Sequence, residues 1–368
     1  MRWPRESSNG SERLQPHESA RIDDVVAPAR RTPAFARPTD PNAPEHAGQA
    51  VMSITPTPPS LSSLSSLARG PALRAFSPEL LTLYEPLAPR TWYQLGGPAR
   101  VFARCLRADD LPPLARWAGE CNLAVKVLGM GANILVRDEG FPGMVIHFDG
   151  ELKSATLDGS TGLLHCGAGT DLMAQAKATA RAGFAGLDVL AGIPASIGGA
   201  LRMNAGGRWG DIGSVVQRVR CLHADGILRW HTAAECRFAY RHSAIPGEII
   251  VEAELQLQPD DQAWNRYLDC LAYKARSQPA MGKNSAGCIF RNPQVNGAAV
   301  SAGLLIDQAG CKGWSEGGAE VSSQHGNFIV ADPARGARAE HVLSLIERVR
   351  EQVARVHGVS LKLEVDIW

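Results

Sequence analysis

A glycine-rich stretch over residues 186–210 constrains the fold of this chain more than any other feature. It has glycines at 186, 192, 198, 199, 206, 207 and 210, set among apolar residues with almost no charge. A surface loop would be more polar, and a buried helix would lose about 1 kcal/mol of stability at each glycine relative to alanine. We therefore predict an irregular, buried or half-buried segment whose backbone approaches a ligand closely, because glycine lacks a Cβ and allows positive φ.

Two interpretations of this stretch are open from its residues. Bare backbone N–H groups bind phosphate oxygens, which makes the stretch a candidate cradle for a nucleotide or dinucleotide. It could equally be a set of tight turns in a β-rich domain. A second candidate cradle is Gly-Met-Gly-Ala-Asn at 129–133, which lacks the third glycine and the following helix of a dinucleotide fingerprint.

Length and charge exclude several classes of protein. The 368 residues predict two or three domains, and a net charge of +1 gives no overall attraction for nucleic acid or an anionic membrane. No apolar run reaches the roughly 18 residues that span a bilayer, and no signal-peptide pattern opens the chain. The 8 cysteines include no C-x-x-C pair, and the 10 histidines show no metal-ligand spacing. We expect reduced thiols, a cytoplasmic protein and no metal site.

Hydrophobic periodicity separates a foldable region from an N-terminal extension. Residues 1–77 are rich in Pro, Ala, Ser and Arg, so we expect them to be disordered or poorly ordered, with Met52 as an alternative start. Apolar spacing predicts helices over 109–121, 170–182, 264–277, 303–308 and 339–357. Short apolar or alternating runs predict strands over 124–128, 134–136, 141–147, 163–168, 215–223, 227–231, 249–256, 327–330 and 361–368.

Seven segments, in their order and spacing, resemble the UDP-N-acetylenolpyruvoylglucosamine reductase (MurB) family. They lie at 129–136, 192–206, 240–243, 285–293, 305–313, 325–328 and 363–365. The resemblance runs from about residue 84 to 368 and implies an α+β fold. A two-subdomain FAD-binding region of the vanillyl-alcohol-oxidase (PCMH) type would precede a smaller α/β substrate-binding domain. The implied limits are 78–145 with the C-terminal strand 360–368, then 146–262, then 263–359.

The resemblance also implies an activity. In such enzymes NADPH reduces non-covalently bound FAD, and the enolpyruvyl ether of UDP-N-acetylglucosamine is then reduced to UDP-N-acetylmuramate, a peptidoglycan precursor. The two ligands would use one site in turn, and a monomer is favoured. Alternatives are an FAD-dependent oxidase on the same scaffold and an inactive flavin-binding homologue.

Three residues are the catalytic candidates. The resemblance matches Arg241 to the arginine of a Tyr-Arg-x-Ser motif, and a planar guanidinium suits a carboxylate. It matches Glu364 to a C-terminal catalytic glutamate, although alternation with its neighbours places this side chain on a solvent face. Cys288 stands where the family commonly has a proton-donating serine. A thiol with an ordinary pKa of about 8.5 is a stronger acid than an alcohol, so we expect proton donation to substrate C2 and sensitivity to alkylation.

The same resemblance supplies candidate binding residues. For FAD they are Gly129, Gly131, Ala132, Asn133, Ile193, Pro194, Ser196, Gly198, Gly199, Asn204 and Gly206. For substrate they are Tyr240, Lys283, Asn292, Gln308 and Asn327. Lys274 and Arg276 could meet the substrate's phosphates or could form the solvated face of their helix. The tyrosine-bearing loop of some family members is absent from 312–325, so the chain resembles the shorter type, and how it covers its substrate stays open.

Overall fold

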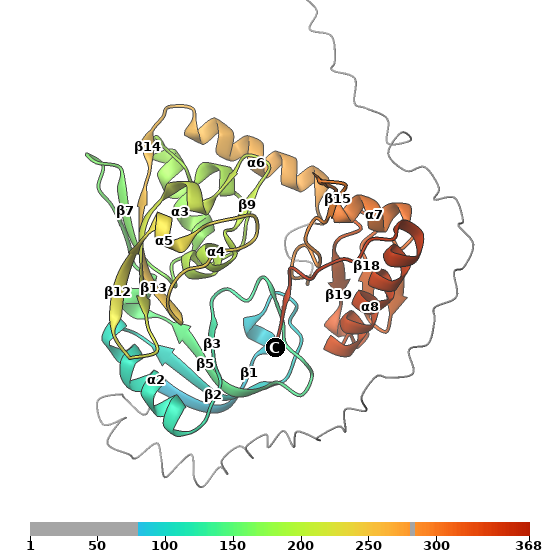
Figure 1. Cartoon of the computed structure of the whole chain (residues 1–368), viewed down its shortest axis with the longest axis horizontal. Helices are drawn as coiled ribbons and strands as arrows, with labels where there is room; N and C mark the ends of the chain where they lie inside the picture. The colour runs from blue at the N-terminus through green and yellow to red at the C-terminus, as the bar shows by residue number, and fades with distance from the viewer. Residues whose placement is uncertain (1–79, 280–283) are drawn as a thin grey trace, which may run out of the picture. The chain divides into compact units, whose positions relative to one another are not determined.

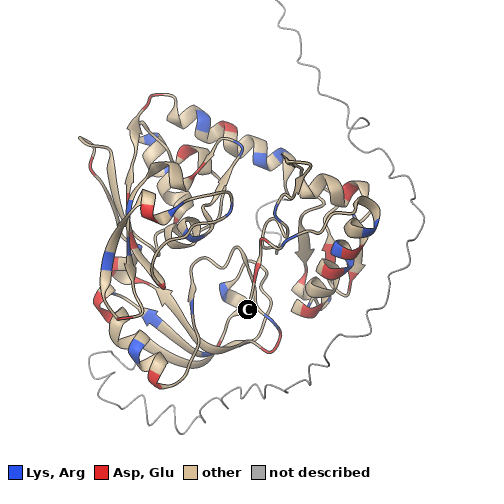
Figure 2. Ribbon diagram, in the orientation of Figure 1, with Lys and Arg blue, Asp and Glu red and all other residues tan. Residues whose placement is uncertain are grey.

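The computed structural model describes residues 80–279 and 284–368, which form three sheet-and-helix parts (Figure 1). The extension expected over 1–77 and the candidate Lys283 lie outside the described residues. None of the helices in the described part is long and apolar enough to cross a membrane. Acidic and basic side chains both occur along the helices (Figure 2).

The first part is a four-stranded sheet in the order β1-β2-β5-β3 with one helix. Its elements are β1 (Leu81–Pro86), β2 (Pro98–Cys105), α2 (Leu111–Glu120), β3 (Val125–Leu128) and β5 (Phe141–Phe148). β1 is antiparallel to β2, whereas β2, β5 and β3 run parallel. The short β4 (Ile134–Leu135) leaves this sheet and pairs in parallel with β20 (Asp366–Ile367) at the C-terminus. The end of the chain is therefore built into its first folded part.

The second part is a five-stranded antiparallel sheet in the order β12-β11-β13-β7-β6. Its strands are β6 (Ala155–Leu157), β7 (Leu163–Gly167), β11 (Val216–Leu222), β12 (Leu228–Thr232) and β13 (Ile249–Gln256). Its helices are α3 (Leu172–Arg181), α4 (Ile197–Met203), α5 (Ala233–Cys236) and α6 (Ala263–Ser277). Two small ladders complete it: β8 (Phe184–Ala185) with β14 (Gln258–Pro259), and β9 (Gly206–Gly207) with β10 (Gly210–Asp211).

Helix α6 packs with the second part. Its buried residues Ala263, Tyr267 and Cys270 belong to the same apolar core as the strands of the first two sheets. The predicted limit at residue 263 assigns this helix to the substrate-binding domain, whereas its apolar face covers α3 and the 3-10 helix Asp188–Leu190. The domain limits themselves stay a prediction.

The third part has a separate core. Its elements are the hairpin β15 (Gln294–Val295) and β16 (Ala298–Ala299), α7 (Ala302–Gln308), the sheet β17 (Ser315–Glu316), β18 (Ala319–Val321) and β19 (Ile329–Ala331), and α8 (Ala339–His357). The apolar face of α8, including Leu345 and Val349, packs into this core. Tyr93 joins the core from the first part, where its buried hydroxyl donates to the Ile329 carbonyl oxygen at 3.0 Å.

The helix predictions are confirmed to within a few residues, and two other expectations are wrong. Residues 186–210 are not wholly irregular, because Ser196 caps α4 and its Oγ accepts from the Gly199 N–H at 3.2 Å. The predicted strand 361–368 is regular only at β20, because its earlier residues hydrogen-bond to the irregular segment 289–291. There the Glu364 N–H donates to the Ile289 carbonyl at 2.8 Å, and this brings the C-terminus beside Cys288.

Candidate functional site

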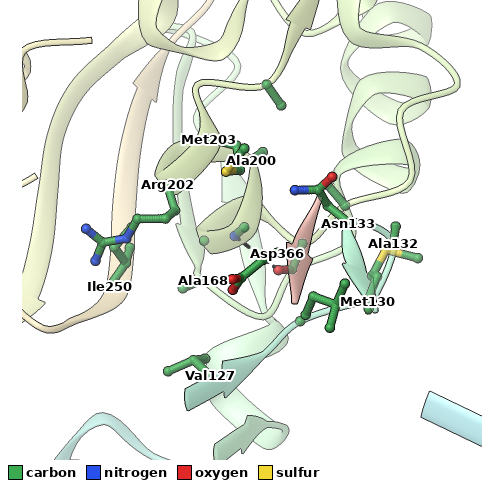
Figure 3. Close-up of a pocket in the computed structure, with 18 of the residues that line it drawn as sticks. Val127, Met130, Ala132, Asn133, Ala168, Ala200, Arg202, Met203, Ile250 and Asp366 are labelled. Atoms are coloured by element: carbon green, nitrogen blue, oxygen red, sulfur yellow. Dashed lines mark hydrogen bonds between the residues drawn. The ribbon is translucent and has the colours of Figure 1, made fainter. Parts of the chain in front are cut away.

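A cavity of about 1110 Å³ is lined by residues from all three parts of the chain. Ligand pockets commonly measure about 300–1,000 Å³, so this cavity has room for a large ligand and part of another. Figure 3 shows Met130, Ala132 and Asn133 of the first glycine-rich region on one side, and Ala200 and Met203 of the second, together with Ala168, on the other. Of the catalytic candidates, Arg241, Cys288 and Glu364 all line it.

The first glycine turn, residues 129–133, places bare backbone against the cavity. Gly131 has φ of +64°, and a Cβ there would lie 2.4 Å from the Arg90 carbonyl oxygen. Its own carbonyl accepts from the Trp92 N–H at 3.0 Å. Within the described residues, the N–H groups of Gly131 and Ala132 donate no hydrogen bond. The turn therefore keeps donors available for an anionic ligand.

The second glycine segment, residues 192–199, differs because the N–H groups at the start of α4 are used internally. The Ile197 and Gly198 N–H groups donate to the Thr170 and Ala168 carbonyls at 2.9 and 2.8 Å. The Gly199 N–H is taken by the Ser196 cap. A Cβ on Gly198 would lie 2.9 Å from the Ala168 Cβ, so this glycine allows α4 to pack closely. The glycines here serve packing, although the segment lines the cavity.

Asn204 holds loops together instead of lining the cavity. It ends α4 in the left-handed region with φ of +42°, and it is buried. Its Nδ2 donates to the Ala239 carbonyl at 3.0 Å, and its Oδ1 accepts from the Gly213 N–H at 2.9 Å. Asn204 thereby anchors the turn 239–242 that carries Arg241.

Arg241 is presented by strained backbone. Ala239 and His242 exchange backbone hydrogen bonds across the turn, and Arg241 has φ of +51°. Left-handed geometry is costly for a non-glycine residue and is concentrated at functional sites. Its Nη1 donates to the Gly206 carbonyl at 2.9 Å, and its Nε lies 2.7 Å from Glu364 Oε1. That Nε–H is not aligned with the carboxylate, so the contact is an ion pair without a hydrogen bond from Nε.

Glu364 faces the cavity and not solvent, which corrects the expectation from alternation. Only 13% of its side chain is exposed, because the segment 289–291 pairs with its backbone and turns it inward. Burial raises the pKa of the Glu364 carboxyl, and the nearby Arg241 and Arg291 act in the opposite direction. The carboxylate is thus held against the arginine in a poorly solvated position.

Cys288 is half-buried beside this ion pair and is a free thiol. Burial and the charge of Glu364 raise the pKa of Cys288 to about 12, while Arg241 and a hydrogen bond from Asn327 lower it. The ordinary acidity expected from sequence is therefore wrong. The thiol stays protonated at neutral pH, and because the thiolate is the nucleophile we now expect slow alkylation.

The substrate candidates lie outside the cavity lining where they are described. Tyr240 is 55% exposed, and its hydroxyl accepts from the Asn292 N–H at 3.4 Å. Asn292 Oδ1 accepts from the Ala302 N–H at 3.0 Å, which ties it to the first residue of α7. The buried Asn327 side chain bonds the Phe290 backbone, and Gln308 ends α7 on the surface.

Sequence reasoning missed a second group of lining residues. Arg208, Trp209 and Tyr273 line the cavity, as does Lys274, which was left between two interpretations. Burial lowers the pKa of Lys274 to about 8, and its Nζ donates to the Ala191 carbonyl at 2.6 Å. Arg276 is exposed and does not line the cavity. The available signal was the run Gly-Gly-Arg-Trp-Gly at 206–210, in which two large side chains are flanked by glycines. The described residues contain no cluster of side chains that could hold a metal ion.

Comparison with known proteins identifies the family. An FAD binding domain model matches residues 99–232, and the C-terminal domain model of UDP-N-acetylenolpyruvoylglucosamine reductase matches residues 278–368. Curated reductases of that name are 39% identical over 287 residues in Heliobacterium modesticaldum and 39% over 299 residues in Alkalilimnicola ehrlichii. These alignments cover 77% and 80% of this chain, and 89% and 97% of the relatives. The chain belongs to the UDP-N-acetylenolpyruvoylglucosamine reductase family.

A crystal structure of a UDP-N-acetylenolpyruvylglucosamine reductase from Thermus caldophilus supports the same assignment. It is 38% identical, has a TM-score of 0.65, and is matched over 78% of this chain and 98% of its own. Members of the reductase family are FAD-dependent oxidoreductases, so the predicted α+β fold, the FAD-binding region and the enzyme class are confirmed. The FAD model contains both glycine regions, whereas Cys288 and Glu364 fall in the C-terminal model and Arg241 lies between the two.

Proposed function

We propose that this protein uses NADPH and FAD to reduce the enolpyruvyl ether of UDP-N-acetylglucosamine to UDP-N-acetylmuramate, in peptidoglycan precursor synthesis. The observation that carries the proposal is the meeting of Arg241, Cys288 and Glu364 in a cavity that also exposes the donors of the first glycine turn. These three residues come from separate segments and form the reacting end of the cavity.

The residues present fit FAD. Gly131 and Ala132 offer N–H donors to its diphosphate, and Gly129 permits the turn to lie against Ser196, because a Cβ at 129 would be 2.2 Å from Ser196 Oγ. Asn133, Ile193, Pro194 and Gly206 complete our proposed contacts along the cavity wall. When bound, FAD would supply hydride-transfer chemistry between NADPH and C3 of the enolpyruvyl group.

Arg241 stabilises the charge that hydride addition creates. Addition at C3 leaves negative charge shared between C2 and the substrate carboxylate, and a permanently charged guanidinium is suited to hold that carboxylate. The turn 239–242 and the Gly206 carbonyl fix the side chain before substrate arrives. Such preorganisation avoids rearrangement during the reaction.

Cys288 donates the proton to C2. Its raised pKa keeps the thiol protonated at neutral pH, so the proton is in place when charge develops. The sulfur then regains a proton from solvent, and the product gains one hydride at C3 and one proton at C2. Arg241 beside the thiol stabilises the thiolate that donation leaves.

Glu364 acts as a positioning residue. It holds Arg241 through the 2.7 Å ion pair, and its charge raises the pKa of Cys288. We further propose that Tyr240, Lys283, Asn292, Gln308 and Asn327 support the substrate. None of the four that the structure describes lines the cavity, so Tyr240, Asn292 and Asn327 would act through the segments to which they hydrogen-bond.

An anaerobic colour assay tests the proposal. The purified protein should be yellow, NADPH should bleach it, and the enolpyruvyl sugar nucleotide should restore the colour without oxygen. Bleaching without recovery by that substrate would contradict the reductase function. Recovery only with oxygen would favour the oxidase alternative.

A further inference from the structure

A small hairpin carries two large side chains into the cavity. β9 and β10 pair through Gly207 and Gly210, which leaves Arg208 and Trp209 at the tip. The Trp209 ring meets the Tyr273 ring of α6 edge to face, with centroids 5.1 Å apart. Both rings stay open to the cavity, because they are 41% and 37% exposed. We call Trp209 and Tyr273 the aromatic pair.

Two cations without carboxylate partners adjoin the aromatic pair. The Arg208 guanidinium lies 5.3 and 5.2 Å from the Trp209 and Tyr273 ring centroids. Arg208 makes no ion pair with any residue that the structure describes, and Lys274 bonds only the Ala191 carbonyl there. By contrast, Lys126 and Arg241 of the same cavity are paired with Asp366 and Glu364. The positive charges beside the aromatic pair are therefore not neutralised by any carboxylate that the structure describes.

The hairpin is continuous with the reacting end. The Gly206 carbonyl at its base accepts from Arg241, and Lys274 is close enough to Arg241 that this charge helps to lower the pKa of the lysine. A ligand held at Arg241 by a reacting carboxylate could extend along the hairpin toward the aromatic pair. Both proposed ligands, the sugar nucleotide and the dinucleotide donor, have a nucleoside diphosphate at some distance from the reacting atoms.

We propose that the aromatic pair, Arg208 and Lys274 bind the nucleoside diphosphate part of the ligand. The base stacks on the exposed rings, and the two cations contact the diphosphate oxygens. This inference rests on the proposed function. It also accounts for substrate cover without a tyrosine-bearing loop, because the hairpin and α6 supply the aromatic surface instead.

The test measures each half-reaction with FAD-loaded full-length protein. Trp209→Ala should raise the concentration for half-maximal rate at least about tenfold for the sugar nucleotide, for NADPH, or for both. Trp209→Phe should restore most of the affinity, and Arg208→Gln should weaken binding at low salt more than at high salt. The limiting rates and the bound FAD should stay within about twofold of the original protein.

Trp264→Leu is a control on α6, the helix that carries Tyr273. Trp264 stacks on Tyr267 at 5.1 Å with Arg181 above it at 4.8 Å, but none of these residues lines the cavity. An effect confined to Trp209 in either half-reaction supports the inference. Unchanged affinity for both nucleotides, loss of FAD instead, or an equal effect of Trp264→Leu would overturn it.

Calorimetric titration with UDP and with NADP⁺ separates this inference from the proposed function. If the original protein turned over no sugar nucleotide but Trp209→Ala still weakened UDP or NADP⁺ binding, the proposed reductase function would be wrong and the nucleoside diphosphate site would be supported. If the original protein turned over substrate and Trp209→Ala bound both probes normally, only the site would fail.

Discussion

The first glycine turn and the second glycine segment look alike in sequence and behave differently in the structure. In the turn at 129–133, the Gly131 and Ala132 N–H groups have no acceptor among the described residues. In the segment at 192–199, the N–H groups of Ile197, Gly198 and Gly199, at the start of α4, all bond within the protein, and its available donors are confined to the residues before the helix. Glycine content therefore does not identify a phosphate cradle. The decisive property is whether the backbone donors are already used.

The largest expected effect is at the first glycine turn. Gly131→Ala places a Cβ 2.4 Å from the Arg90 carbonyl in backbone that disfavours any side chain, so we expect FAD affinity to fall by at least about a hundredfold. Gly199→Ala, whose Cβ would meet only Ser196 Oγ at 3.3 Å, should change affinity by less than about fivefold. Flavin titration measures both. Equal losses in the two variants would break the comparison.

Folding controls accompany this pair. Gly159→Ala adds a Cβ with no atom within 4 Å, so it should change neither FAD affinity nor thermal stability. Circular dichroism melts of the apoproteins show whether Gly131→Ala still folds. A folded Gly131→Ala protein with normal FAD affinity would contradict the role of this turn.

A substitution at Arg241 tests whether a side chain recognises the substrate, in contrast to the backbone N–H groups that we propose bind FAD. Arg241→Gln should slow sugar-nucleotide reduction about a hundredfold or more, because one charged donor to developing negative charge is lost. Reduction of FAD by NADPH should change much less. Arg237→Gln is the matched control, since Arg237 is also left-handed, with φ of +44°, but is exposed. Stopped-flow absorbance measures the rate of each half-reaction. An equal loss of rate in FAD reduction and in sugar-nucleotide reduction would contradict this role of Arg241.

Glu364 should have a smaller, indirect effect. Glu364→Gln removes the ion pair but leaves Arg241 bonded to the Gly206 carbonyl, so we expect a loss of about tenfold in the limiting rate. Removing its negative charge should also lower the pKa of Cys288. Alkylation rates measured against pH would show this, and an unshifted profile would refute the positioning role.

We expect the smallest effect at Lys274, on the affinity for UDP. Its pKa of about 8 means that the ammonium is lost as pH rises through 8, whereas a bound diphosphate favours the charged form. The affinity for UDP should therefore be highest below pH 8 and fall by up to about tenfold toward pH 9. The Lys274→Met variant should bind UDP weakly, and its affinity should not depend on pH over this range. If the affinity of the original protein for UDP did not change with pH, Lys274 would not contact the diphosphate.

The sequence predicted local elements better than it predicted the site. Helical periodicity located α3, α6 and α8, and the sequence also supplies the N-cap of α3, where Asp171 accepts from the Met173 and Ala174 N–H groups. These features depend on neighbouring residues. Glu364 was misplaced because its inward orientation depends on pairing with residues 289–291, far away in the sequence.

The chemistry of the site was also set by distant contacts. The acidity of Cys288 depends on Glu364, Arg241 and Asn327, so an ordinary thiol pKa was a poor guide. The aromatic pair joins the tip of a hairpin to α6, 64 residues later in the sequence. Family motifs located Arg241, Cys288 and Glu364, but only the fold shows that they share one cavity.

The most direct test of the central claim follows FAD absorbance in reduced protein mixed anaerobically with the enolpyruvyl sugar nucleotide. The original protein and Cys288→Ser should recover their colour, because each retains a proton donor at this position. Cys288→Ala should recover at least about a hundredfold more slowly, since a positioned acid contributes about 10²–10⁴ to such a step. Recovery of Cys288→Ala at the original rate would show that Cys288 does not donate the proton.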